Sequence, residues 1–212
     1  WMALGLLALV LLVIVGVTRH QKNKAVSADS PVTLSEVDEN RPELDVELLT
    51  VNPYSRPGTA LEKVNGIVIH YTANPGATAI ANRNYFENLK DTHTTKASSH
   101  FVVGLEGEIV QCIPTAEIAY ASNDRNSDTI SIECCYKNED GSFEQATYDS
   151  VIKLTAWLCA KFGLTSEDVI RHYDVTGKLC PLYYVEHEDA WAQFKKDVDT
   201  YLQVYKTGDE NG

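Results

Sequence analysis

The sequence predicts an α/β domain in which a mixed central β-sheet is flanked by helices. Short, apolar, β-branched segments recur along the chain, as expected for strands that are covered on both faces. Longer segments with apolar residues at helical spacing lie between and after them. One pair of strand segments is joined by the short connection "LEGE", which is typical of a hairpin. Helices interspersed among strands, together with one hairpin, predict a mixed sheet covered by helices.

The predicted elements follow one another from residue 66 onward. The five strands are GIVIHYT (66–72), SHFVVG (99–104), EIVQCIP (108–114), TISIECCY (129–136) and DVIRHYD (168–174). The helices are TAIANRNYFENLKD (78–91), QATYDSVIKLTAWLCAKFG (145–163) and a last helix with Trp191, Phe194, Val198, Tyr201, Leu202 and Tyr205 on one face. Gly163 is a natural C-cap for the second helix, because glycine readily adopts the left-handed conformation that ends many helices.

Charge and cysteine content exclude two classes of protein. Eighteen basic residues against 30 acidic ones give a net charge of −12, which argues against a nucleic-acid partner, since phosphate backbones need a basic face. The five cysteines are odd in number and include no C-x-x-C pair, so a dense disulfide framework is excluded. One disulfide between Cys112 and Cys134, from neighbouring strands, remains open.

The sequence predicts four regions. Residues 1–18 form a transmembrane anchor or signal segment, 19–59 a polar linker, 60–206 the folded domain and 207–212 a tail. The first region contains 17 uncharged residues followed by the basic "TRHQKNK", and it can be an anchor, a cleaved signal or a buried core helix. We prefer the anchor. The expected location is then the cell membrane, with a single span and an extracellular domain, or outside the cell if the segment is cleaved.

Strand parity identifies two candidate functional side chains. Alternation places His70 on one strand face with Thr72, and Glu133 on one face with Ser131 and Cys135. His70 comes near the end of its strand, where loops form sites. A carboxylate inside an apolar strand is costly unless it is paired or bonded, so Glu133 is either half of a buried ion pair or a catalytic group. Taken alone, His70 is better interpreted as a satisfied core histidine than as a functional group.

The segment "IRHYDVTGKLCP" places His172 and Cys180 eight positions apart around a turn that also carries Lys178. It can be a metal site, a reactive-thiol site or an ordinary loop that holds a buried cysteine. Catalytic zinc takes three protein ligands, imidazole and thiolate among them, and keeps one position open. Two neutral imidazoles, from His70 and His172, and one thiolate leave zinc with a net positive charge. The long gap between residues 70 and 172 makes no short motif.

Four blocks in order, "GIVIHYTANPGAT", "SSHFVVGLEGEIVQCIP", "ISIECC" and "VIRHYDVTGKLCP", resemble the zinc-dependent N-acetylmuramoyl-L-alanine amidases. This family includes the peptidoglycan recognition proteins and the amidase-type phage lysozymes, and the resemblance covers roughly residues 64–200. It implies a mixed sheet flanked by helices, one Zn²⁺ held by His70, His172 and Cys180, Glu133 as general base, and Lys178 as the group that stabilises the oxyanion. The implied reaction cuts the bond between N-acetylmuramic acid and L-alanine in peptidoglycan, and the predicted N-terminal segment adds the membrane as a partner.

The resemblance also has a departure and leaves alternatives. Some amidases of the family have tyrosine immediately before the histidine of the "HF" block, where this chain has Ser99. Substrate contacts are expected at the mouth of the site, at Tyr71, Thr72, Asn74, Asn84 and His100. His100 can equally be a core histidine, or lie beside the zinc without binding it. A peptidoglycan-binding module without activity is one alternative, and it is disfavoured because Cys180 is present. A thiol hydrolase that uses Cys180 or Cys135 is the other, and it leaves the His70 block unexplained.

Overall fold

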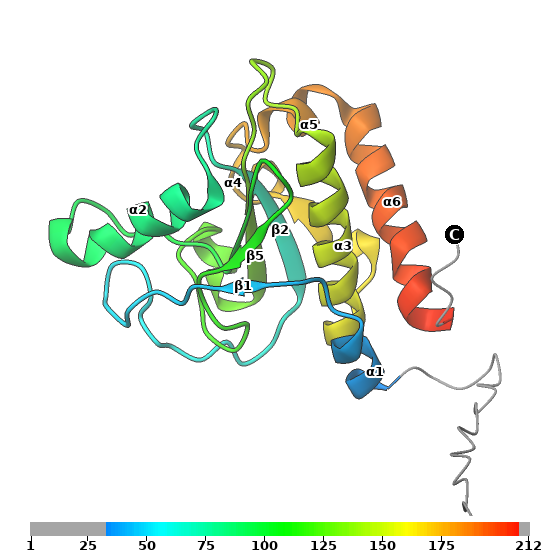
Figure 1. Cartoon of the computed structure of the whole chain (residues 1–212), viewed down its shortest axis with the longest axis horizontal. Coiled ribbons are helices and arrows are strands. Elements are labelled where there is room, and N and C mark those ends of the chain that lie inside the picture. Colours follow the sequence, from blue (N-terminus) through cyan, green and yellow to red (C-terminus); the bar gives the residue numbers. More distant parts are fainter. Residues whose placement is uncertain (1–32, 208–212) are drawn as a thin grey trace, which may run out of the picture. The chain divides into compact units, whose positions relative to one another are not determined.

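The computed structural model describes residues 33–207, which form one sheet with helices on both of its faces (Figure 1). The six strands lie in the order β1-β4-β3-β5-β2-β6. Their bounds are Asp45–Val46 (β1), Gly66–Tyr71 (β2), Phe101–Val103 (β3), Ile109–Gln111 (β4), Thr129–Cys134 (β5) and Val169–Arg171 (β6). Only β3 and β4 pair antiparallel, as the predicted hairpin requires, and all other pairs are parallel. The predicted mixed sheet is therefore confirmed.

Within residues 33–207, six α-helices and two 3-10 turns connect and cover the strands. The helices are α1 (Leu34–Glu39), α2 (Ala79–Thr92), α3 (Gln145–Phe162), α4 (His172–Thr176), α5 (Leu182–Glu186) and α6 (Glu188–Thr207), and the turns are η1 (Asn123–Ser127) and η2 (Ser166–Asp168). The side chain of Thr78 caps α2 by accepting from the backbone N–H of Ala81 at 3.3 Å. Gly163 ends α3 with φ 68°, as the sequence predicts.

The two faces of the sheet bury separate apolar cores. Ile67, Ile69, Ile130 and Ile132 point to the side of α3 and α6, which pack against each other (Figure 1). The alternate residues face the other way, where Val102, Val110, Cys112 and Cys135 pack with Phe86 of α2. This alternation matches the strand parity that the sequence predicts. His70 and Glu133 therefore lie on the α2 side of the sheet.

The five cysteines all lie within the described residues, and all are free and buried. The disulfide between Cys112 and Cys134 that the sequence left open is not formed. Cys134 belongs to the core under α3 and α6, whereas Cys112 belongs to the core under α2, so the two thiols lie on opposite faces of the sheet.

Part of the predicted linker packs on the sheet. Strand β1 pairs with β4 at the sheet edge, with Asp45 opposite Val110. Val37 of α1 and Leu49, just after β1, are 4% and 1% exposed, because each inserts an apolar side chain into a core. The folded part therefore includes residues before position 60.

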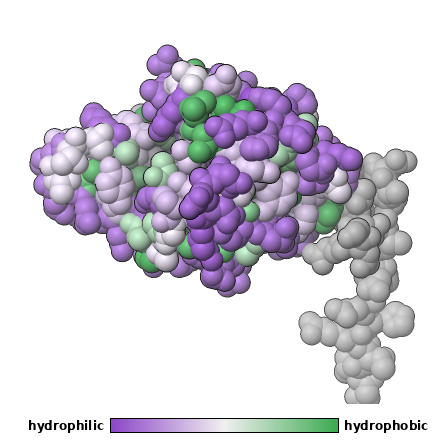
Figure 2. Space-filling model, turned by 90° about the horizontal axis from the view of Figure 1, so that it is seen from above, coloured by the Kyte–Doolittle hydropathy of each residue, from purple (hydrophilic) through white to green (hydrophobic). Residues whose placement is uncertain are grey.

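The expected location in the membrane needs correction. The predicted anchor or signal segment, residues 1–18, lies outside the described residues. Within residues 33–207, no helix is both long enough and apolar enough to cross a membrane. On this finding we do not retain the single-pass membrane location. Figure 2 shows that hydrophilic residues cover most of one face of the domain, where hydrophobic residues gather in one small group.

Candidate metal centre

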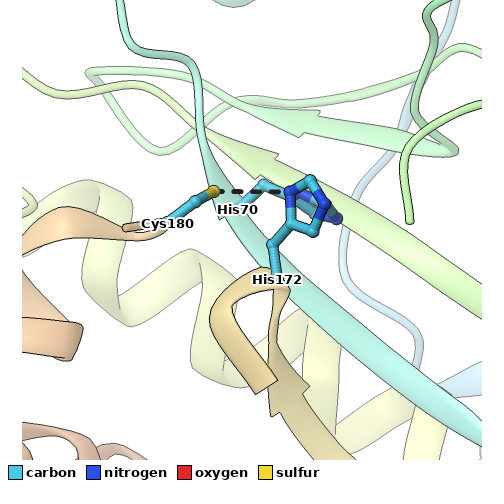
Figure 3. A group of neighbouring side chains, drawn as sticks. All are labelled: His70, His172 and Cys180. Carbon is cyan, nitrogen blue, oxygen red and sulfur yellow. Dashed lines mark hydrogen bonds between the residues drawn. The ribbon is translucent and has the colours of Figure 1, made fainter. Parts of the chain in front are cut away.

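Three side chains from separate parts of the chain converge at one edge of the sheet (Figure 3). His70 is near the end of β2, and His172 directly follows the neighbouring parallel strand β6. Parallel strands bring their carboxyl ends to the same edge, so both imidazoles meet there. Cys180 precedes α5 and completes the group, with Sγ 3.8 Å from Nδ1 of His70. One ligand atom from each residue lies within 4.8 Å of the others, and all three residues are buried.

The turn between His172 and Cys180 is closed by local hydrogen bonds. The Asp174 carboxylate accepts from the backbone N–H of Arg171 at 2.8 Å, which caps the short helix α4 at its start. Gly177 ends α4 in the left-handed conformation, with φ 79°. The backbone N–H of Tyr173 then donates to the Cys180 carbonyl at 3.0 Å. The chain is therefore folded back so that the thiol returns to the first histidine.

The donor atoms of this group fit a zinc ion. Tetrahedral zinc places imidazole and thiolate ligand atoms about 3.4–3.6 Å apart. The distance of 3.8 Å between Cys180 Sγ and His70 Nδ1 is close to that spacing. Nδ1 of His172 is buried and has no hydrogen-bond partner among the described residues, as expected for a nitrogen reserved for a ligand. Burial, with the charge of Lys178, lowers the pKa of both histidines, and His172 further lowers that of His70. Both imidazoles are therefore neutral, the form that binds metals.

The thiol needs a cation to become a ligand. Burial and the nearby charge of Glu133 raise the pKa of Cys180 to about 12, although the backbone of Tyr71 and the charge of Lys178 oppose the shift. Cys180 is therefore protonated at neutral pH unless a cation displaces the proton. Metal binding at this site must release that proton, so the affinity is expected to fall at low pH.

Glu133 stands beside His70 in the parallel pairing of β2 and β5. Its Oε2 is buried and has no hydrogen-bond partner within residues 33–207, and no ion pair of this part of the chain includes it. Burial raises the pKa of this carboxyl to about 8, against the opposing charge of Lys178. The alternative of a buried ion pair is therefore not realised. Lys178 itself is exposed on the turn before Cys180.

Comparison with known proteins identifies the family. Residues 60–182, more than half of the chain, match the N-acetylmuramoyl-L-alanine amidase family. The chain belongs to this family. It is 39% identical over 165 residues to N-acetylmuramoyl-L-alanine amidase CwlL of Bacillus licheniformis, which covers 72% of this chain and 45% of that protein. It is also 36% identical over 171 residues to amidase BlyA of Bacillus subtilis (strain 168), covering 71% of this chain and 45% of that protein. The chain thus spans about half the length of the curated relatives it matches.

Solved structures share the amidase fold. A mutant endolysin from Bacillus subtilis superimposes with a TM-score of 0.62 and 31% identity, over 74% of this chain and 98% of that one. The catalytic domain of XlyA gives a TM-score of 0.62 and 30% identity, over 74% and 99% of the two chains. The mixed sheet flanked by helices is therefore the fold of these amidase-type endolysins.

The remaining positions predicted from the amidase resemblance have varied surroundings. Tyr71 and Thr72 directly follow His70, and the Tyr71 ring packs on Tyr136 with 5.2 Å between centroids. Asn74 is exposed and donates to Oδ1 of Asn82 at 2.9 Å. Asn84 is exposed on α2, where it accepts a 3.2 Å bond from Arg83. Substrate contacts at Tyr71, Thr72, Asn74 and Asn84 stay predictions.

For His100, the surroundings are those of a core histidine, the alternative that the sequence left open. Its ring is 1% exposed, and both ring nitrogens are used. Nδ1 accepts from the backbone N–H of Ser131 at 3.0 Å, and Nε2 donates to the Glu117 carbonyl at 2.9 Å. Because β3 pairs with β5, His100 lies deeper along the sheet than Glu133. It therefore holds the loop to the sheet and has no ring nitrogen free for substrate.

Sequence reasoning missed two residues that contact the histidines. The Oγ of Ser122 lies 3.2 Å from Nε2 of His70, and Oδ1 of Asn123 lies 3.0 Å from Nε2 of His172. Neither contact has a local signal, since "ASND" reads as an ordinary polar turn. It also missed Arg171, which is 6% exposed immediately before His172. The available signal was an arginine inside the predicted strand DVIRHYD, directly before the candidate ligand His172.

Proposed function

We propose that this chain is a zinc-dependent N-acetylmuramoyl-L-alanine amidase. Its substrate is bacterial peptidoglycan, and the bond cut is the amide between the lactyl group of N-acetylmuramic acid and L-alanine. The observation that carries the proposal is the convergence of His70, His172 and Cys180 beside Glu133, whose Oε2 is buried and has no hydrogen-bond partner within residues 33–207. The amidase activity named for the relatives CwlL and BlyA supports the choice of substrate.

His70, His172 and Cys180 would hold one Zn²⁺ per chain. When bound, the ion supplies Lewis acidity that makes a water more acidic and polarises the scissile carbonyl. Two neutral imidazoles and one thiolate are a donor set that retains a net positive charge at the ion and leaves a fourth position open.

Glu133 and Lys178 supply the proton transfer and the charge stabilisation. Amide hydrolysis requires that the attacking water lose a proton and that the leaving amine of L-alanine gain one. Glu133 takes the first proton and delivers it to the amine, so that the carboxylate is restored at the end of the cycle. Lys178, two residues before Cys180, would stabilise the oxyanion that develops on the carbonyl.

The environment of the cysteines argues against a thiol hydrolase. A nucleophilic cysteine needs a lowered pKa. Burial instead raises the pKa values of Cys180 and Cys135 to about 12, and the charge of Glu133 adds to both shifts. A protonated thiol is a weak nucleophile, whereas a cation converts Cys180 into a good ligand.

The decisive experiment pairs zinc analysis with mass spectrometry of digested peptidoglycan. The purified chain should carry close to one zinc, and the digest should contain stem peptides with free L-alanine N-termini. The metal-free chain should lose this activity and regain it when zinc is returned. Full activity in the metal-free chain would exclude the zinc mechanism. A zinc-loaded chain that binds peptidoglycan without releasing L-alanine N-termini would instead identify a binding module.

A further inference from the structure

One short turn contacts both candidate histidine ligands on the side away from Cys180. Ser122 and Asn123 are consecutive residues at the start of η1, and each meets one imidazole at its Nε2 atom. The distances are 3.2 Å from Ser122 to His70 and 3.0 Å from Asn123 to His172. His70 belongs to β2 and His172 is the first residue of α4, so this turn contacts side chains 102 positions apart in the sequence.

Hydrogen bonds and one ion pair within the turn hold its backbone in place. The Oδ1 atom of Asn126 accepts two backbone N–H groups, from Ala121 at 3.0 Å and from Ser122 at 2.6 Å. An ion pair of 2.7 Å joins Arg125 to Asp128 and closes the far end of the turn. The next residues form β5, the strand that carries Glu133. The turn is therefore tied to the same sheet that positions the rest of the site.

The contacts determine which ring nitrogen faces the metal site. The amide oxygen of Asn123 can only accept, so Nε2 of His172 carries the hydrogen and Nδ1 keeps its lone pair. That Nδ1 is the buried atom without a partner among residues 33–207. In His70, Nε2 faces Ser122 while Nδ1 faces the Cys180 sulfur at 3.8 Å. Both rings are therefore held at Nε2 and present Nδ1 to the same space.

We infer that Ser122 and Asn123 are positioning residues: Asn123 fixes the tautomer and orientation of His172, and Ser122 fixes the orientation of His70, so that each histidine offers Nδ1 to the metal. This inference rests on the proposed zinc centre. Partners of the second ring nitrogen typically contribute about 10–100-fold to metal affinity. The backbone is consistent with this role. Asn123 adopts the left-handed conformation, with φ 52°, which few residues other than glycine, asparagine and aspartate tolerate.

The test uses Asn123→Gly, because glycine accepts the positive φ and removes only the amide side chain. The full metal-free chain is labelled with ¹⁵N-histidine, and long-range ¹H–¹⁵N spectra report the tautomer of each ring. We expect the His172 ring to lose its fixed Nε2–H tautomer in Asn123→Gly. In Ser122→Ala, we expect the ring-nitrogen signals of His70 to shift, because the contact to its Nε2 is lost. Zinc affinity, measured by competition with a chromophoric chelator, should fall about 10–100-fold in each variant.

Two further variants separate positioning from general damage. Asn65→Ala removes a 3.2 Å bond to Asp128, at the other end of the turn, and should leave the zinc affinity within about twofold of the parent chain. Asn123→Asp keeps an oxygen acceptor and tolerates the same backbone, and it should restore the affinity lost in Asn123→Gly.

The outcomes discriminate the two proposals. Unchanged tautomers, or unchanged zinc affinity in Ser122→Ala and Asn123→Gly, would overturn the positioning role. Equal losses in Asn65→Ala would assign the effect to the fold of the turn and overturn it as well. A parent chain that binds no zinc would remove the proposed metal centre, while the tautomers of the metal-free chain would still decide whether the turn holds the rings.

Discussion

Replacement of Arg171, next to the candidate metal centre, should lower the stability of the domain. Its side chain is 8% exposed and lies between the rings of Tyr173 and Trp191, at 5.3 and 5.4 Å from their centroids. Nη1 donates to the Tyr184 carbonyl and to Glu188, both at 2.8 Å. One guanidinium therefore connects α4, α5 and α6 immediately before His172.

The cost of Arg171→Met follows from these contacts. Methionine keeps an apolar stem between the rings, so the main losses are polar. The buried Tyr184 carbonyl loses this donor, which costs about 1–3 kcal/mol. Asp174 and Glu188 are 31% and 68% exposed, so water replaces the guanidinium there and the two ion pairs contribute only about 1 kcal/mol together. The expected sum is about 2–4 kcal/mol, or a fall in Tm of about 6–12 °C.

Equilibrium denaturation in urea checks this value, with unchanged m as the sign of a common unfolded state. Lys195→Met is the matched control, because it removes a surface ion pair whose Glu167 partner is 83% exposed, and it should cost less than about 1 kcal/mol. The cap of α4 survives in both variants, since Asp174 still accepts the backbone N–H of residue 171. If Arg171→Met lowers the free energy of unfolding by less than about 1 kcal/mol, Arg171 does not stabilise the packing of α4, α5 and α6 as argued.

Three further predictions concern the metal, the base and acid stability. Cys180→Ala should reduce bound zinc from about one per chain to near zero, by elemental analysis, and abolish wall hydrolysis while the circular dichroism spectrum is kept; retained zinc would exclude the ligand role. Glu133→Gln should keep zinc and lose about 10²–10⁴-fold in kcat, and an active variant would show that another group is the base. Burial raises the pKa of Glu87, but hydrogen bonds from Lys90 and Thr50 and the charge of Arg83 outweigh it and hold this pKa at about 2, against an ordinary 4.5. Its stabilisation, about 1–2 kcal/mol after solvent screening, is present above pH 4.5 and lost as the pH falls towards 2, so Glu87→Gln should flatten the stability curve in that range.

The parts of the fold that were predictable have local signals. The run "GIVIHYT" is apolar because β2 lies in the interior of the sheet, and Gly163 marks the end of α3 because its φ is positive. Strand β1 gave no such signal. It has only two residues, both exposed, and it exists because its backbone pairs with β4 some 65 positions further on. A pairing of that kind is decided by tertiary packing and leaves no local pattern.

The site divides in the same way. Four candidate residues could be identified from the sequence. Glu133 is a carboxylate inside an apolar strand, and His70, His172 and Cys180 are ligand-type residues in blocks that occur in the order of the amidase family. Ser122 was not, because a serine in a polar turn is unremarkable until the fold places it against a histidine. His100 looks as distinctive in the sequence as His70, and only the pairing of β3 with β5 shows that it lies deeper in the sheet.

The serine at position 99 clarifies how the proton moves in the proposed reaction. Ser99 is fully buried, and its hydroxyl oxygen lies 2.9 Å from the Ser131 carbonyl and 3.0 Å from the Phe101 carbonyl. This hydroxyl is therefore engaged by the sheet and is not a proton donor to substrate. Hydrolysis nevertheless needs only one shuttling group, because the proton taken from water is the proton that the leaving amine requires. Glu133 has a free oxygen and a pKa raised to about 8, so it both accepts and returns a proton near neutral pH. In the proposed mechanism, Glu133 alone would therefore carry the proton, where some members of the family add a phenol.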